Sequence, residues 1–338
     1  MMSSERGFMV EELLQYFSEN ARDLDWRHNP TPYRVWISEI MLQQTRVEAV
    51  KSYYARFMKE LPTVEALAEV SEEKLFKLWE GLGYYSRARN LQKAAKIIVD
   101  AGKFPDTLEE IAKLPGVGPY TAGAIASIAF GLPTPAVDGN VLRVLSRIKG
   151  RNYNAKEAAA ELKDLYPPGR ASDFTQSLME LGACVCLPNG KPLCETCPVA
   201  QECIALRDNR IDELPEKPEK KPRKIEEKNI LVLEYRGKFA LLKRPAKGLL
   251  AKLWSFPEFS DDFKNELEQI GYSVEKVAKK PSAKHIFTHI EWKMKIFLVT
   301  LSAVPEETGY VWVNREDLEE NYAIPAAYQG ALKVIMEI

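Results

Sequence analysis

The stretch LPGVGPYTA, residues 114–122, decides the fold of this chain. It joins two segments in which apolar residues recur at helical spacing. Its glycines Gly116 and Gly118 permit a tight turn and let the backbone approach a ligand closely. Backbone amides at the start of the following helix can hold a phosphate group. A turn of this kind is otherwise only a connection between helices, so the surrounding sequence has to decide its role.

Helical periodicity extends on both sides of this turn, from about residue 8 to residue 205. Residues 208–228 are rich in Lys, Glu and Pro and nearly devoid of apolar residues, which is typical of a solvated linker. Short β-rich runs begin at Ile230 and are accompanied by two helical stretches. We therefore predict a multidomain protein with an all-α domain over 1–207, a linker over 208–228 and a smaller α+β domain over 229–338.

The overall composition excludes some classes of protein. A length of 338 residues fits two domains, each able to bury its own apolar core. The net charge of −1 does not by itself indicate a polyanionic partner. No stretch approaches the roughly 18 apolar residues that a membrane helix needs, and the N-terminal sequence lacks a basic region leading into an apolar core. We expect a soluble, cytoplasmic protein with no membrane partner.

All five cysteines lie within one short segment, as Cys184, Cys186, Cys194, Cys197 and Cys203. A disulfide framework would spread them along the chain, so their clustering favours a metal site in a reducing compartment. Counted from Cys186, the spacing C-x7-C-x2-C-x5-C suits one iron–sulfur cluster or one zinc ion and does not decide between them. Cys184 packs as a small apolar side chain, or it takes the place of Cys186 as the first ligand.

Two acidic residues are candidates for catalysis. Glu39 lies among apolar residues in WISEIMLQQTR, residues 36–46. Such neighbours withdraw a carboxyl group from water, which raises its pKa and suits a general acid, whereas most helix glutamates are simply solvated. Asp138 lies in AVDGNV, residues 136–141, where the structural alternative is a helix cap or a turn.

The hairpin turn, the cysteine loop and these two acidic stretches together resemble the MutY-type adenine DNA glycosylases of the helix-hairpin-helix superfamily, most specifically over residues 26–203. The resemblance implies that Glu39 protonates N7 of adenine and that Asp138 stabilises oxocarbenium-like charge on the sugar. Asn140 is implied to orient Asp138 or a water molecule. Bifunctional relatives carry a lysine in the slot of Tyr120, so Tyr120 implies a monofunctional glycosylase that uses water. Its phenol is implied to support the Asp138 carboxylate or an intermediate.

The same resemblance implies one [4Fe–4S] cluster in the loop 184–203. Its ligands are implied to be Cys186, Cys194, Cys197 and Cys203. The gap between the first two of these is one residue longer than is common in the family, which keeps Cys184 open as an alternative ligand.

For DNA, the resemblance implies that the target base is flipped out of the duplex. Gln44 is implied to fill the gap that the flipped base leaves in the duplex, and Tyr84 is implied to wedge the base step. The alternative for Gln44 is an amide on a helix surface, and the alternative for Tyr84 is an aromatic side chain in the core. Arg27 and Glu180 are implied to surround the extruded adenine, with Glu180 accepting from its exocyclic amine. Further expected contacts with DNA come from Leu82, Gly116 and Gly118.

The second domain resembles the Nudix fold, most clearly in GLLAKLWSFPE, residues 248–258. No glutamate-rich Nudix box follows Phe259, so we expect recognition and not hydrolysis. The run Phe287, Thr288 and His289 resembles the loop with which MutY proteins contact 8-oxoguanine, while packing or capping is the alternative role of the histidine. The implied partner is double-stranded DNA with an A:8-oxoguanine or A:G mispair, bound by a monomer and associated with the nucleoid in a bacterium.

Three other functions are alternatives to this one. An endonuclease III-like glycosylase and lyase for oxidised pyrimidines is opposed by Tyr120 and by the second domain. A Nudix hydrolase with a helical accessory domain is opposed by the missing metal box. A non-catalytic iron–sulfur protein that binds DNA is opposed by the joint presence of Glu39 and Asp138.

Overall fold

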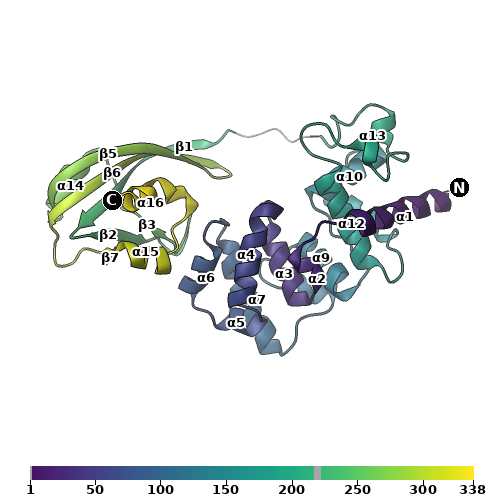
Figure 1. Cartoon of the computed structure of the whole chain (residues 1–338), viewed down its shortest axis with the longest axis horizontal. Coiled ribbons are helices and arrows are strands. Elements are labelled where there is room, and N and C mark those ends of the chain that lie inside the picture. The colour runs from purple at the N-terminus through teal and green to yellow at the C-terminus, as the bar shows by residue number, and fades with distance from the viewer. Residues whose placement is uncertain (1, 217–221) are drawn as a thin grey trace. The chain divides into compact units, whose positions relative to one another are not determined.

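The computed structural model describes residues 2–216 and 222–338, so residues 217–221 of the expected linker lie outside the described residues (Figure 1). Backbone contacts divide the chain into two compact units, which we describe separately. The first contains Met1–Glu69 and Arg89–Glu219, and the second contains Val70–Ala88 and Lys220–Ile338. No helix in the described ranges has the length and apolar character needed to span a bilayer.

The first unit is helical throughout its described part. Its elements are α1 (Met2–Asn20), α2 (Asp25–His28), α3 (Pro32–Leu42), α4 (Val47–Glu60), α5 (Val64–Glu69), most of α7 (Ser86–Ala101), α8 (Leu108–Ile111), α9 (Pro119–Phe130), α10 (Gly139–Lys149), α11 (Ala155–Lys163), α12 (Ala171–Cys184), the short 3-10 helix η1 (Cys194–Thr196) and α13 (Ile204–Arg207).

Helix α3 lies in the interior of this unit and packs against α9. It begins at the side-chain cap of Thr31 and with Pro32 in the first turn, as helix starts commonly do. Almost every residue from Tyr33 to Met41 is buried. The α9 helix is rich in small residues, and a side chain at Gly123 would lie 2.2 Å from the carbonyl oxygen of Pro135. The candidate acid Glu39 lies on α3, and Tyr120 lies on α9.

Helices α10 and α12 pack on each other and α12 packs on α1, with one apolar core among them. The half-buried side chains of Cys184, Cys186 and Cys197 pack against the edge of this core. The cysteine loop that follows α12 is therefore positioned by its packing on this core.

The second unit is built on a seven-stranded sheet with the path β3-β2-β1-β6-β5, in which β4 pairs with β1 and β7 pairs with β2. Only β1 and β6 are parallel among the pairs in the described residues. The strands are β1 (Lys224–Tyr235), β2 (Lys238–Lys243), β3 (Trp254–Ser255), β4 (Glu258–Phe259), β5 (Ser273–Ile286), β6 (Ile290–Ala303) and β7 (Val311–Val313).

Helices cover both faces of this sheet (Figure 1). One face packs against α15 (Arg315–Asn321), the 3-10 helix η2 (Ala326–Tyr328) and α16 (Gln329–Met336), and the other face packs against α14 (Phe263–Gln269). A further helix, α6 (Glu72–Trp79), belongs to the same unit and packs on α15. The predicted fold class, an all-α region followed by an α+β region, is confirmed.

The boundaries differ from the expected ones in two places. Strand β1 begins at Lys224, inside the range expected as linker, because its first residues pair with β6 while their side chains remain largely exposed and polar. Residues 70–88 group with the C-terminal region, whereas the sequence predicted a single helical domain over 1–207. Helical periodicity shows that α6 forms, but it does not show which core α6 joins.

Candidate active site

Glu39 is buried in α3, with only 5% of its surface exposed. Burial raises the pKa of its carboxyl to about 7. A hydrogen bond from the Tyr120 hydroxyl to Oε2 of Glu39, 2.8 Å long, and the charge of Arg27 act in the opposite direction, while the charge of Asp138 raises the pKa further. A carboxyl with this pKa exchanges its proton near neutral pH, which suits a general acid.

Tyr120 lies in the first turn of α9, directly after Pro119 of the hairpin. Burial and the neighbouring carboxylates raise the pKa of its phenol well above the ordinary value. The phenol therefore stays protonated and donates to Glu39, whereas support of the Asp138 carboxylate or an intermediate was expected. The hairpin turn and the acid are thus joined directly.

Asp138 is the N-cap of α10, so the helix-cap role considered as its structural alternative is present. Its Oδ1 accepts the backbone N–H groups of Asn140 at 2.9 Å and of Val141 at 2.8 Å. Its Oδ2 accepts from the Asn140 side-chain amide at 2.8 Å. These three bonds fix the orientation of the carboxylate, and its charge reaches Glu39.

Arg143 connects this carboxylate to the cysteine loop. Its Nη2 donates to Oδ1 of Asn140 at 3.0 Å and to the carbonyl of Gly182 at 2.7 Å. Its Nε donates to the carbonyl of Cys186 at 2.8 Å. Arg143 lies outside the motifs from which the site residues were predicted. The available signal is a pair of arginines, Arg143 and Arg147, four residues apart and buried on an amphipathic helix.

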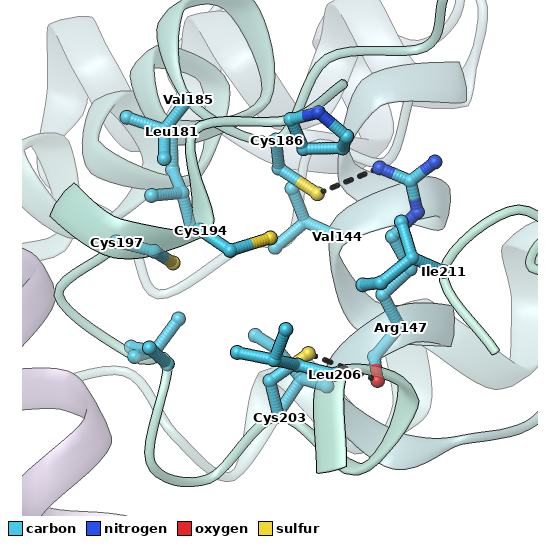
Figure 2. Close-up of a pocket in the computed structure, with 14 residues that line it drawn as sticks. Val144, Arg147, Leu181, Val185, Cys186, Cys194, Cys197, Cys203, Leu206 and Ile211 are labelled. Atoms are coloured by element: carbon cyan, nitrogen blue, oxygen red, sulfur yellow. Dashed lines mark hydrogen bonds between the residues drawn. The ribbon is translucent and has the colours of Figure 1, made fainter. Parts of the chain in front are cut away.

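The four cysteines from Cys186 onward line one cavity, shown in Figure 2, together with apolar side chains of α10 and α12. The Nη1 of Arg147 donates to Sγ of Cys186 at 3.3 Å and to the carbonyl of Leu187 at 3.0 Å. The thiol of Cys203 lies 3.5 Å from the carbonyl of Arg147. Cys184 does not line this cavity, and its thiol faces Oε1 of Glu180 at 3.6 Å.

Burial raises the pKa of the Cys197 thiol to about 12 and also raises the pKa values of Cys194 and Cys203. These thiols are therefore protonated at neutral pH when no cation is bound, and a metal group that binds them displaces their protons.

Arg27 and Glu180 lie together, as expected. The Glu180 side chain is fully buried, and its carboxylate pairs with Nη2 of Arg27 and with Nε of Arg22, each at 2.7 Å. Burial alone would raise the pKa of Glu180, but the hydrogen bonds from Arg22 and Arg27 lower it to about 2. Arginine donors occupy both carboxylate oxygens, so the contact between Glu180 and adenine stays a prediction. Arg22 was not among the predicted site residues, because no motif marks it.

Gln44 follows α3, is exposed and has a positive φ of 57°. In the hairpin turn, Gly116 has a φ of 79°, and a side chain there would lie 2.8 Å from Cβ of Asn90. Gly118 caps α9 and lies in open space. These positions are compatible with close approach of a DNA strand, and their contacts with DNA stay predictions.

Tyr84, in the second unit, is 52% exposed and has a φ of 46°. The loop before it is fixed by Trp79, whose Nε1 donates to the Gly83 carbonyl at 3.0 Å, and by Arg87, whose Nη2 donates to the carbonyls of Leu82 and Gly83. Leu82 is buried, so a contact of its side chain with DNA stays a prediction.

Phe287, Thr288 and His289 form the turn between β5 and β6. The Phe287 backbone N–H donates to the Ile290 carbonyl at 2.8 Å, and its ring packs against Trp292 with the ring centres 4.8 Å apart. Thr288 and His289 are exposed. The Thr288 hydroxyl lies 3.2 Å from the Tyr84 hydroxyl. Phe287 therefore anchors the turn, while the next two residues face outward beside Tyr84.

Comparison with known proteins gives two family matches. Residues 37–168 match the HhH-GPD superfamily of base excision DNA repair proteins, and residues 229–334 match the NUDIX domain. The first match contains the turn at 114–122, Glu39 and Asp138, and the second contains the turn between β5 and β6.

Individual proteins give closer comparisons. The chain is 34% identical to an adenine DNA glycosylase of Buchnera aphidicola, over 88% of each protein. It is 41% identical to an adenine DNA glycosylase of Arabidopsis thaliana over 72% of its own length, but it spans only 46% of that relative. A solved structure of a thermostable thymine-DNA glycosylase superposes with a TM-score of 0.57 at 31% identity, covering 61% of this chain and 99% of that one.

Proposed function

Because this chain belongs to the adenine DNA glycosylases, enzymes of base excision repair that hydrolyse an N-glycosyl bond, we propose that it removes adenine mispaired with 8-oxoguanine or guanine. It acts as a monomer on double-stranded DNA and leaves the sugar–phosphate strand intact. The observation that carries this proposal is the buried Glu39, which has a pKa of about 7 and accepts a hydrogen bond from Tyr120.

Glu39 supplies the proton that makes adenine a leaving group. It transfers this proton to N7 of the flipped adenine, the bond between C1′ and N9 breaks, and the bonding electrons stay with the base. Asp138, whose charge already reaches Glu39, stabilises the positive charge that develops at C1′. A water molecule then adds to C1′ and gives its proton to the Glu39 carboxylate, which returns to its acid form.

Tyr120 favours hydrolysis over strand cleavage. A lysine in this position would attack C1′ and form a Schiff base, whereas a phenol whose pKa lies well above the ordinary value is a poor nucleophile. Its hydroxyl instead holds the Glu39 carboxyl in one orientation. The expected product is an abasic site.

We also propose one [4Fe–4S] cluster, and the residues present fit it. Cys186, Cys194, Cys197 and Cys203 line one cavity with apolar walls, and a guanidinium group donates to one of the sulfurs (Figure 2). Soft thiolates are the ligands that iron–sulfur clusters take. Bound there, the cluster would tie together the segment that follows α12, the η1 turn and the start of α13, where these four cysteines lie.

The protein purified without oxygen is expected to contain about four irons per chain and to absorb broadly in the visible range. Cys186→Ser should lose iron because this thiol lines the cavity, while Cys184→Ser, the matched control, should keep it. Iron and sulfide analysis measures both. Stoichiometric zinc without iron, or iron loss in the Cys184 variant alone, would contradict the proposed site.

Recognition of the opposite base is assigned to the turn at the end of the β5–β6 hairpin. Adenine in a mispair is chemically an ordinary adenine, so the enzyme has to read the other strand. Thr288 and His289 are exposed, and the turn that carries them is anchored by Phe287 on Trp292. The Tyr84 hydroxyl beside Thr288 places the expected wedge of the base step next to the expected reader.

Replacing Thr288 and His289 together by alanine is expected to reduce the preference for 8-oxoguanine over guanine by about tenfold to a hundredfold, the effect of losing one or two good contacts to a base. Single-turnover excision from both duplexes measures it. Glu306→Ala with Glu307→Ala, in another exposed loop of the same unit, is the matched control. An unchanged preference in the Thr288 and His289 variant would show that the opposite base is read elsewhere.

A further inference from the structure

Residues 70–88 join the second unit, although they lie within the helical part of the sequence. This segment contains α6 and the loop that carries Tyr84. Besides the contact of Tyr84 with Thr288, polar side chains at each end of α6 contact the sheet domain. Neither group belongs to the catalytic residues described above.

At the C-terminal end of α6, two side chains bind the backbone before η2. Glu80 Oε1 accepts the backbone N–H of Ile324 at 2.7 Å, and Lys77 Nζ donates to the carbonyl of Tyr322 at 3.2 Å. Lys77 and Glu80 also pair with each other at 2.8 Å, and their side chains are only 26% and 22% exposed. The partly buried position makes these contacts stronger than ordinary surface contacts.

At the N-terminal end of α6, two ion pairs reach β2 and the loop before β3. Glu73 pairs with Lys243 at 3.1 Å, and Glu72 pairs with Lys252 at 3.3 Å. The Lys243 contact also lowers the pKa of Glu73. Ion pairs this exposed are individually weak and are screened by salt. They add charge complementarity between α6 and the sheet domain, while the hydrogen bond of Glu80 to the Ile324 N–H is the stronger contact.

Glu80 is the last residue before the Tyr84 loop, and Tyr84 meets Thr288 at its hydroxyl. We propose that this α6 docking surface, formed by Glu72, Glu73, Lys77 and Glu80 against Lys243, Lys252 and the backbone at 322–324, determines opposite-base specificity. It holds the wedge residue Tyr84 and the reader Thr288 in one body, so that the base step and the opposite base are tested together. Glu80 is a positioning residue in this arrangement, and the inference rests on the proposed function of the 287–289 turn.

The critical variant is Glu80→Ala, with Glu80→Gln as its conservative counterpart. Alanine removes the acceptor for the Ile324 N–H, whereas a glutamine side chain keeps one. The preference for 8-oxoguanine over guanine is expected to fall about threefold to tenfold in the alanine variant, the size of one partly buried hydrogen bond. It is expected to stay near the wild-type value in the glutamine variant. Iron content and circular dichroism check that both proteins are folded.

Charge reversal gives a second, independent test. Glu73→Lys and Lys243→Glu should each reduce the preference at low salt, and the double variant should restore it. The same exchange at Lys333 and Glu337, an exposed pair on α16, is the matched control and should change nothing.

A reduced preference that returns in the glutamine and double variants supports the proposal. An unchanged preference in Glu80→Ala, or an equal loss of excision from both duplexes, would overturn it, because a purely structural role affects both substrates alike. If the wild-type protein itself shows no preference, the proposed function of the turn fails first. If the wild-type protein shows the preference and the α6 variants keep it unchanged, the inference about α6 fails while the proposed function of the turn stands.

Discussion

Glu39→Gln is expected to slow adenine excision severely while the protein still folds and binds mispaired DNA. Glutamine has nearly the same shape and can accept the Tyr120 hydrogen bond, but it cannot donate a proton from a carboxyl group. General acid catalysis is typically worth about 10²–10⁴-fold, so single-turnover excision should fall by about that factor. Binding of the variant to the same duplex, measured by fluorescence anisotropy, should stay near wild type because Glu39 makes no phosphate contact in this account.

The dependence of the excision rate on pH tests the same assignment, because its direction can be predicted. The acid is active in its protonated form, so wild-type excision should fall as the pH rises through about 7, the pKa of Glu39. The residual activity of Glu39→Gln should lack this step. Stability follows the same group: its pKa is raised above the ordinary value of 4.5, so the stability present below pH 4.5 is lost as the pH rises toward 7. The variant should therefore lose less stability than wild type over this window.

Near-normal single-turnover excision by Glu39→Gln would remove this residue from the mechanism. A wild-type profile that rises through neutral pH would show that the reactive form is the carboxylate. Thermal melting at several pH values separates both results from a folding defect.

Asp138→Asn is expected to have the second large effect, a loss of about 10²–10³-fold in excision with binding retained. Asparagine keeps an oxygen that can cap the amides of Asn140 and Val141, but it has no negative charge to stabilise the sugar cation. Asp138→Ser is the matched control for capping, because serine caps a helix about as well as aspartate and is equally uncharged.

Both Asp138 variants should be folded and nearly inactive, because both keep a helix cap and both lack the negative charge. Single-turnover rates and melting temperatures measured together decide this. Substantial excision by the serine variant would show that the aspartate acts mainly as a cap.

The sequence was sufficient to predict the helices on which the proposed catalytic residues lie. Local patterns identify the helices, and the apolar neighbours of Glu39 already indicate its burial and its raised pKa. The hairpin motif and the Asp-Gly-Asn turn are also local, so Tyr120 and Asp138 could be selected before their positions were known. The structure adds that Tyr120 donates directly to Glu39.

Other parts of the site depend on long-range packing and could not be read from local patterns. Arg22 pairs with Glu180, which is 158 residues away, and Arg143 reaches the carbonyl of Cys186 from a different helix. The spacing of the cysteines left Cys184 and Cys186 as alternatives, and the proposal of Cys186 draws on its place in the cavity lining. The grouping of residues 70–88 with the sheet domain likewise follows from contacts that form after the helix does.

The most direct test is single-turnover incubation of the wild-type protein with a duplex that carries one adenine opposite 8-oxoguanine, analysed with and without alkali. Parallel duplexes place guanine or thymine opposite the same adenine. The account predicts fast adenine release opposite 8-oxoguanine, slower release opposite guanine and none opposite thymine, with strand breaks only after alkali treatment. Strand cleavage without alkali, or equal release from all three duplexes, would contradict it.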